Sequence, residues 1–183
     1  MHKRFVPAVV LLLGLVAAGA NAQDTRQVGV AMGYPSSIGL IWRASDTVAL
    51  RPEFSFSGGS TGSSSPGGYS SDTTAWGLGV SALFYARKWD KASAYLTPRF
   101  SYSHTSTTAT QLLAGTPSTA ENHGNAYSIA GSIGAQYSLS RRFGVFGEVG
   151  FAYTHQTSTY TAVENTANTW GTRTAIGVTL CLR

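Results

Sequence analysis

Apolar residues alternate strictly with small or polar residues along most of the chain. In segment 74–88, Trp76, Leu78, Val80 and Phe84 fall on one face, opposite mainly glycine, serine and alanine. A period of two residues is typical of a β-strand with two different faces. The pattern recurs along the chain and predicts eight strands, at 27–34, 37–43, 47–57, 74–88, 92–103, 125–139, 143–153 and 170–182.

The connections between these strands alternate in length. Tight turns are predicted at 45–46, 89–91 and 140–142, and long polar loops at 57–72, 107–123 and 158–167. The first connection on the long-loop side, near Pro35 and Ser36, is short. An up-and-down meander places all tight turns at one end and all long loops at the other. The hairpins also resemble one another, which indicates a repeated ββ unit.

The composition decides which face of this sheet points outward. Only 11% of the residues are charged, whereas 43% are hydrophobic and 21 are glycines. A soluble domain carries about 25% charged residues, and a soluble carrier barrel of lipocalin type would need many of them on its outer face. Small residues instead suit the narrow lumen of a barrel whose apolar face meets lipid. The sequence therefore predicts an all-β fold, an eight-stranded antiparallel up-and-down transmembrane β-barrel.

Aromatic positions agree with a membrane-spanning wall. Trp76 and Phe84 lie eight residues apart on one face, and Tyr127 and Tyr137 lie ten apart. In tilted strands these pairs span roughly 19 to 24 Å, close to the ~25 Å apolar band of such barrels. The predicted aromatic girdle comprises Trp42, Phe54, Trp76, Phe84, Phe100, Tyr102, Tyr127, Tyr137, Phe143, Phe151, Tyr153 and Trp170.

The N-terminus has the pattern of a secretory signal. His2, Lys3 and Arg4 precede the apolar run 5–18, which is followed by Ala20-Asn21-Ala22. The pattern predicts a signal peptide at 1–22, cleaved on export, and a barrel domain at 23–183. Cys181 is the single cysteine, so no intramolecular disulfide is expected.

The strand count, the rhythm of turns and loops and the phrase Thr47-Val48-Ala49-Leu50-Arg51-Pro52-Glu53-Phe54 resemble the small eight-stranded outer-membrane barrels. These are typified by the transmembrane domain of outer membrane protein A and its X-type relatives. The resemblance implies a monomer in the cell outer membrane, in contact with lipid and lipopolysaccharide. It also implies insertion by the barrel-assembly machinery through the C-terminal strand. Here the chain ends in Leu182-Arg183, whereas such barrels usually end in an aromatic residue.

Five charged residues fall on the predicted inner face away from the strand ends: Arg51, Glu53, Arg99, Glu148 and Arg173. A lone charge in a packed lumen is costly, so these residues should pair. Similar barrels hold an internal ion-pair cluster that plugs the lumen or gates a small conductance. Both interpretations remain open here, whereas eight strands leave too little room for a diffusion porin.

An enzymatic alternative rests on His104 and Ser106, which share the outward face. With Glu121 or Glu164 they would form a Ser-His-Glu arrangement, as in a lipid A deacylase. The deacylases of this family carry a longer His-x-Ser-Asn pattern, and here Thr107 follows Ser106. The simpler hypothesis is that His104 and His155 are polar rim residues and that the protein is not an enzyme.

Other chemistries leave no signal in the sequence. His104, His123 and His155 lack the spacing of metal ligands, so neither a metal nor a cofactor is expected. Basic residues form no cluster of the kind that binds nucleic acid.

What remains is a structural or surface role, in envelope integrity, adhesion or partner binding. The central strands run about 15 residues, whereas crossing a bilayer takes 9–11. Segments 103–110 and 154–161 should therefore project as a Thr- and Ser-rich fence, whose edge either pairs with extended segments of a partner or is only a solvated collar. The sequence identifies no surface ligand.

Overall fold

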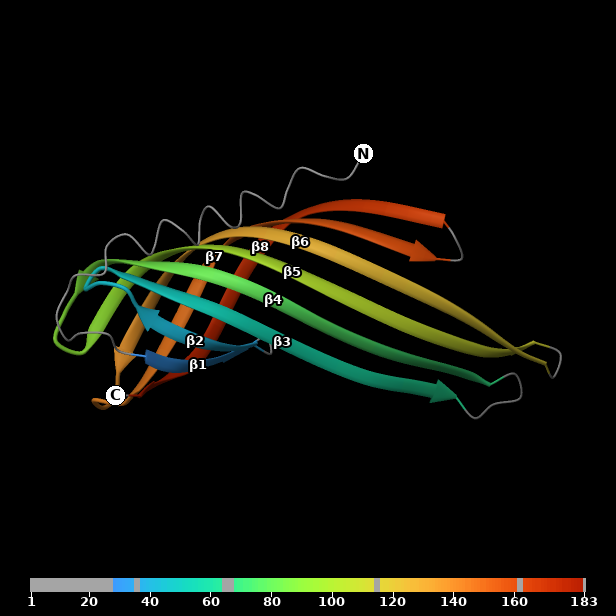
Figure 1. Ribbon diagram of the computed structural model, residues 1–183, viewed down its shortest axis with the longest axis horizontal. Coiled ribbons are helices and arrows are strands. Elements are labelled where there is room, and N and C mark those ends of the chain that lie inside the picture. The colour runs from blue at the N-terminus through green and yellow to red at the C-terminus, as the bar shows by residue number, and fades with distance from the viewer. Residues whose placement is uncertain (1–27, 35–36, 64–67, 114–115, 161–162, 183) are drawn as a thin grey trace.

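The computed structural model describes residues 28–34, 37–63, 68–113, 116–160 and 163–182, and these form a ring of eight antiparallel strands (Figure 1). Each strand pairs with its neighbours in sequence, and the last closes on the first. No helix in the described ranges is long and apolar enough to cross a membrane. The strands are β1 (Val28–Tyr34), β2 (Ser37–Arg43), β3 (Val48–Ser63), β4 (Tyr69–Lys88), β5 (Ala92–Leu113), β6 (Thr116–Ser138), β7 (Phe143–Tyr160) and β8 (Val163–Leu182).

Two of the tight turns repeat the same hydrogen-bonded geometry. In the β2–β3 turn, Ser45 Oγ accepts from the backbone N–H of Val48 at 3.1 Å. In the β6–β7 turn, Ser140 Oγ accepts from the N–H of Phe143 at the same distance. A serine that satisfies local backbone donors stabilises a short turn. The repeated turns agree with the ββ unit that the sequence predicts.

The three long connections predicted as loops, 57–72, 107–123 and 158–167, are largely strand. Pairing continues to Ser63↔Tyr69, to Leu113↔Thr116 and to Tyr160↔Val163. Threonine favours extended backbone, but both faces of these segments carry polar side chains. They therefore lack the hydrophobic alternation by which the sequence reveals a strand.

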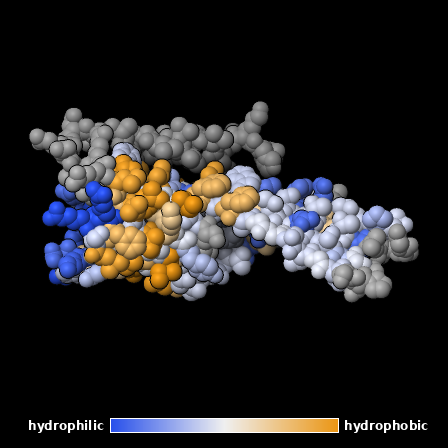
Figure 2. All heavy atoms as spheres, turned by 90° about the horizontal axis from the view of Figure 1, so that it is seen from below, coloured by the Kyte–Doolittle hydropathy of each residue, from blue (hydrophilic) through white to orange (hydrophobic). Residues whose placement is uncertain are grey.

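The outer face of the ring carries a broad apolar band. Its members include Phe151 and Trp170, whose exposed fractions are 70% and 77%. Figure 2 shows this band on one face of the barrel body, with hydrophilic residues beyond it at one end and the projecting strands at the other. Exposed apolar surface of this extent requires an apolar environment, in agreement with a wall that faces lipid.

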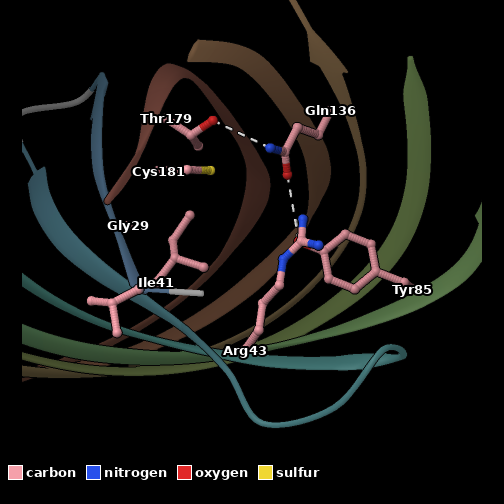
Figure 3. Close-up of a pocket in the computed structure, with 8 residues that line it drawn as sticks. Gly29, Ile41, Arg43, Tyr85, Gln136, Thr179 and Cys181 are labelled. Atoms are coloured by element: carbon pink, nitrogen blue, oxygen red, sulfur yellow. Dashed lines mark hydrogen bonds between the residues drawn. The ribbon is translucent and has the colours of Figure 1, made fainter. Parts of the chain in front are cut away.

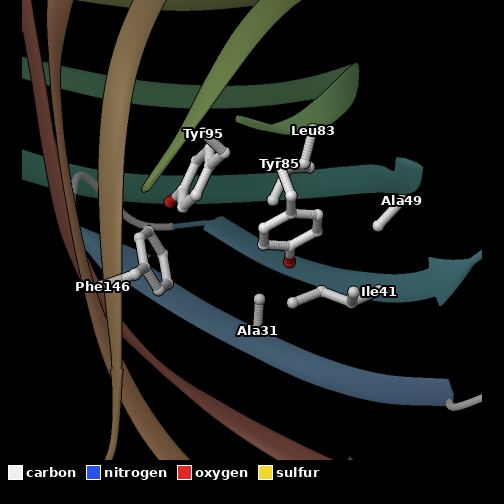
Figure 4. Close-up of a cluster of buried hydrophobic side chains, with 7 residues drawn as sticks. All are labelled: Ala31, Ile41, Ala49, Leu83, Tyr85, Tyr95 and Phe146. Carbon is white, nitrogen blue, oxygen red and sulfur yellow. The ribbon is translucent and has the colours of Figure 1, made fainter. Parts of the chain in front are cut away.

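The lumen is filled by side chains rather than open. Tyr85 and Tyr95 meet edge to face, with their ring centroids 5.6 Å apart, and Phe146 packs in the same cluster (Figure 4). Glycines make room for these rings. An ideal Cβ at Gly177 would lie 2.6 Å from the Phe146 ring. The alternation of large and small inward residues thus closes the middle of the barrel.

The first hairpin is much shorter than the others. Strands β1 and β2 have 7 residues each, whereas β6 has 23. Pairing of β1 with β8 ends at Tyr34↔Ile176, and pairing of β2 with β3 ends at Ile38↔Phe54. Beyond these points β3 to β8 form an open, curved six-stranded sheet, seen as the long projection in Figure 1. This projecting sheet has two edges, 55–62 of β3 and 163–175 of β8, which the described strands leave without a neighbour on one side.

Candidate functional site

The structure brings the five predicted inner charges into one network. Arg51 bridges both carboxylates: its Nε lies 2.7 Å from Glu53 Oε1, and its Nη2 lies 2.7 Å from Glu148 Oε1. Arg99 Nη2 contacts the other oxygen of Glu53 at 2.6 Å. Arg173 Nη1 contacts the other oxygen of Glu148 at 3.0 Å. Each carboxylate is therefore held between two guanidinium groups.

Local structure explains why these side chains meet. Arg51 and Glu53 are two residues apart on β3, so both point into the lumen while Pro52 points outward. Residues opposite them are small: an ideal Cβ at Gly79 would lie 3.1 Å from Arg99 Nη2. Arg51 is only 2% exposed and Glu148 only 5%. At such burial the charges are tolerated because each has an opposite partner.

Sequence reasoning missed the neutral residues that complete this network. Tyr95 donates its hydroxyl to Glu148 Oε1 at 3.1 Å. Ser81 and Ser132 supply hydroxyls 3.4 Å from Glu53 Oε1 and Arg173 Nη1. The Arg51 guanidinium also lies 5.1 Å from the centre of the Phe146 ring. All four residues occupy inward positions along their strands. They were missed because the prediction considered only charged residues on the inner face, and these four are neutral.

A second polar layer lies toward the tight-turn end of the lumen. Tyr85 donates to Gln136 Oε1 at 3.4 Å, and Gln136 Nε2 donates to Thr179 Oγ1 at 3.2 Å. In Figure 3 Gln136 reaches across the lumen toward Arg43 and Tyr85. The cavity among these residues has a volume of about 10 Å³, which is room for one water at most. This layer therefore lies between the charged network and the tight turns, and it narrows the lumen at a second level.

The twelve predicted girdle residues all point outward, but they do not lie at one level. One group borders the projecting sheet, where Tyr153 and Trp170 pack with ring centroids 4.8 Å apart and Tyr102 and Tyr127 at 5.1 Å. A second group lies near the tight turns. The upper group is Trp76, Tyr102, Tyr127, Tyr153 and Trp170; the lower group is Trp42, Phe84, Tyr137 and Phe143; and Phe54, Phe100 and Phe151 lie between them.

The imidazole and the carboxylates of the deacylase hypothesis lie beside other residues. His104 Nδ1 lies 2.9 Å from Asn125 Oδ1. Glu121 lies beside His123, with Oε2 3.7 Å from Nε2. Glu164 is paired with Thr159 at the far end of β8. The contacts of the described residues therefore do not join Ser106, His104 and a carboxylate into one chain.

The predicted fence of projecting strands is present in the structure. However, the two segments that we expected to form its free edge lie inside the sheet instead. Segment 103–110 belongs to β5, which pairs with both β4 and β6, and segment 154–161 falls largely in β7, which pairs with both β6 and β8. Their backbone groups are already used inside the sheet. The free edges belong to β3 and β8, because the first hairpin is too short to cover them.

Three further predictions concern other parts of the chain. No group of three or more metal-ligating side chains occurs in the part of the chain that the structure describes. Cys181 is a free thiol. The predicted signal peptide 1–22 and the terminal Arg183 lie outside the described residues.

Comparison with known proteins gives one matching family and several matching solved structures. The model of the outer membrane protein beta-barrel domain matches residues 8–180. A major outer membrane protein from Thermus thermophilus has 12% identity and a TM-score of 0.57, over 87% of this chain and 100% of its own. CarO2 of Acinetobacter baumannii has 17% identity and a TM-score of 0.43, over 87% of this chain and 100% of its own. Neisserial surface protein A has 15% identity and a TM-score of 0.40, over 84% and 92%. No curated protein matches the chain.

Proposed function

The chain belongs to the outer membrane protein beta-barrel domain family, and on that premise we propose that it acts at the cell surface by pairing the free edges of its projecting sheet with extended segments of a partner. The protein is an outer-membrane β-barrel. We orient the barrel so that its tight turns face the periplasm and its projecting sheet faces the outside of the cell. The apolar band between them lies in lipid.

The observation that carries the proposal is the pair of uncovered edges. Residues 55–62 and 163–175 present backbone groups that the described strands do not use. Edge strands are normally blunted or covered, because an open edge is a template for another strand. Here the edges are long and rich in serine and threonine. Such an edge can bind a peptide through main-chain hydrogen bonds.

The interior of the projecting sheet is built to be stiff. Thr73 and Thr107 place their hydroxyl oxygens 3.1 Å apart across β4 and β5. Thr110 and Thr119 do the same at 3.2 Å across β5 and β6. Cross-strand threonine pairs stabilise a sheet. An ordered sheet loses little conformational entropy when a partner strand is added, which favours binding.

The lumen, in this proposal, has a structural role. The charged network and the layer at Gln136 close the barrel, so the protein neither conducts steadily nor serves as a diffusion porin. Nor do we assign it catalysis, because the imidazole of His104 and the carboxylate of Glu121 contact Asn125 and His123 rather than each other. The barrel then serves to anchor the projecting sheet in the membrane.

The test places lysine on the free edges, since lysine is a residue that natural edge strands use against pairing. The edge variant carries Thr61→Lys on β3 and Thr166→Lys on β8. A matched control carries Thr105→Lys on β5 and Thr157→Lys on β7, two strands that have neighbours on both sides. Each pair has one inward and one outward position, so added charge and placement are alike.

Cells expressing each variant are compared for attachment to host-cell layers and for survival in serum, at equal surface amounts. We expect the edge variant to lose these phenotypes and the control to keep them. Equal loss in both variants would assign the effect to charge rather than to edge pairing. Full retention in the edge variant would reject the proposal, and a collar without a partner would then be the better description.

A further inference from the structure

The charged network in the lumen holds one positive charge more than it neutralises. Arg51, Arg99 and Arg173 supply three guanidinium groups, whereas Glu53 and Glu148 supply two carboxylates. Arg51 and Arg99 bind opposite oxygens of the same carboxylate, that of Glu53, so like charges are also held close together. Excess charge inside a narrow lumen is costly unless an opposite charge joins it.

The projecting sheet does not supply that negative charge. Each acidic residue in its described part is separated by an even number of positions from an outward-pointing aromatic residue on the same strand. All of them therefore lie on the outer face; they are Asp72, Glu121 and Glu164. The inner face of the sheet, which leads down to the network, has no carboxylate among the residues that the structure describes.

A cavity lies against the network on the side of the projecting sheet. It has a volume of about 80 Å³, and Glu53 and Arg99 line it at the network end. Two inward glycines of β4 leave this space: an ideal Cβ at Gly79 would lie 3.1 Å from Arg99 Nη2, and one at Gly77 would lie 2.7 Å from Ser55 Oγ. The cavity is reached where the first hairpin ends, since the first residue of β2 also lines it.

The cavity presents donors without acceptors. Ser55, Ser101 and Ser103 line it from inward positions, and their hydroxyls have no hydrogen-bond partner in the described ranges. The Arg99 side chain keeps 20% of its surface exposed, against 3% for Arg51, and the Arg99 Nε has no hydrogen-bond partner there either. Hydroxyls and a guanidinium group are donors that suit an anion.

We propose that this cavity binds a small monovalent anion, chloride from the surrounding medium, which supplies the third negative charge of the network. The excess is a single positive charge, so one monovalent anion balances it. Chloride accepts from the serine hydroxyls and lies beside the Arg99 guanidinium. The inference concerns the lumen alone and does not depend on edge pairing.

Chloride-35 magnetic resonance tests the site on the full chain, folded in an uncharged detergent, because chloride bound to a protein gives a broader line than free chloride. Ser101→Asp places a fixed carboxylate opposite Gly79, its partner on β4, where the Arg99 guanidinium lies. A like charge beside a bound ion costs several kcal/mol, so we expect chloride affinity to fall at least about tenfold. Exposed cations at the tight turns give the same background in each variant.

Ser71→Asp is the matched control. Ser71 also faces inward on the projecting sheet and lies outside the cavity. It stands eight residues from Gly79, about 26 Å along the strand, which is well beyond the screening length in physiological salt. We expect this variant to bind chloride as the wild type does. Arg99→Gln, which removes the excess charge instead of balancing it, should lose the chloride-dependent broadening as Ser101→Asp does.

Stability gives a second measurement, because an anion that binds only the folded barrel raises the midpoint of urea unfolding. Sodium gluconate at equal concentration is the comparison, since its six-carbon anion is too long for the cavity. We expect chloride to raise the midpoint above that in gluconate for the wild type and Ser71→Asp, and not for Ser101→Asp. Heat-dependent gel mobility verifies that each variant is folded.

Two results would overturn the proposal. One is chloride-dependent broadening in Ser101→Asp and Arg99→Gln as large as in the wild type, which would assign the binding to surface cations. The other is an equal midpoint of the wild type in chloride and gluconate, which would leave only general screening by salt. Loss of the response in Ser71→Asp as well would also reject it, because added charge far from the cavity would then suffice.

Discussion

Tyr95 of β5 lies over Gly134 of β6, the residue with which it is paired, so closely that an ideal Cβ at Gly134 would stand 2.4 Å from the Tyr95 ring. The same tyrosine donates its hydroxyl to Glu148. The absence of one side chain on β6 therefore decides where the ring lies, and the ring in turn supports the charged network.

We expect Gly134→Ala to destabilise the barrel. Tyr95 is 1% exposed and has little space to move aside. Overpacking of this kind costs about 1–3 kcal/mol. The midpoint of urea unfolding in detergent or lipid should fall. Gly131→Ala is the matched control on the same strand, where an added Cβ meets nothing within 4 Å, and it should leave the midpoint unchanged.

Glu148→Gln should destabilise the barrel more strongly. The change keeps the size of the side chain but removes the charge that holds Arg51 and Arg173. Breaking a buried ion pair from one side costs about 3–5 kcal/mol, because the remaining charge is left uncompensated. Urea unfolding again measures the effect. Glu121→Gln, at an exposed pair with His123, should have no measurable effect, and an equal loss there would contradict the assignment to burial.

The orientation of the barrel predicts which insertions are visible on intact cells. An epitope tag inserted at Gly68, between β3 and β4, should bind antibody from outside. A tag at Asp90, in a tight turn between β4 and β5, should bind only after the cells are broken. Both sites lie between strands, so both insertions should be tolerated. Labelling of the Asp90 tag on unbroken cells would show that the barrel has the opposite orientation.

Ser106→Ala separates the surface role from the deacylase alternative. Since His104 is bound to Asn125, we expect lipid A from cells that express the protein to keep all its acyl chains. Mass spectrometry of lipid A from cells with empty vector, wild type and Ser106→Ala should give three identical spectra. Loss of an acyl chain in the wild type, restored by the substitution, would establish the enzyme instead.

Alternation made the barrel wall predictable from the sequence. One slip of register moves every side chain to the other face, so the inward placement of Arg51, Glu53 and Glu148 follows from the positions of their apolar neighbours. The alternation could not identify the projecting strands, because water lies on both of their faces. With 107–123 taken as a loop, the pairing of β5 with β6 near the rim was unspecified.

The contacts of His104 with Asn125 and of His155 with Asn168 depend on that pairing. His104 meets Asn125 only because β5 and β6 stay in register as far as Leu113↔Thr116. His155 meets Asn168 through the corresponding register of β7 and β8. The spacing of these residues along the chain matches no known ligand motif. From the sequence, both histidines were therefore interpreted only as polar rim residues. The neutral partners of the charged network were hidden for a different reason, since the serines and the tyrosine that contact Glu53, Glu148 and Arg173 carry no charge to place.

The short first strand also determines where the ring comes apart. β1 holds the closing seam with β8 through 7 residues, whereas β5, in the middle of the sheet, has 22. Backbone amides at a short seam exchange with solvent through small openings, whereas those of long central strands need a larger part of the fold to open. Hydrogen exchange should therefore begin at β1, and closure between β1 and β8 should be the last step of assembly and the first to reverse.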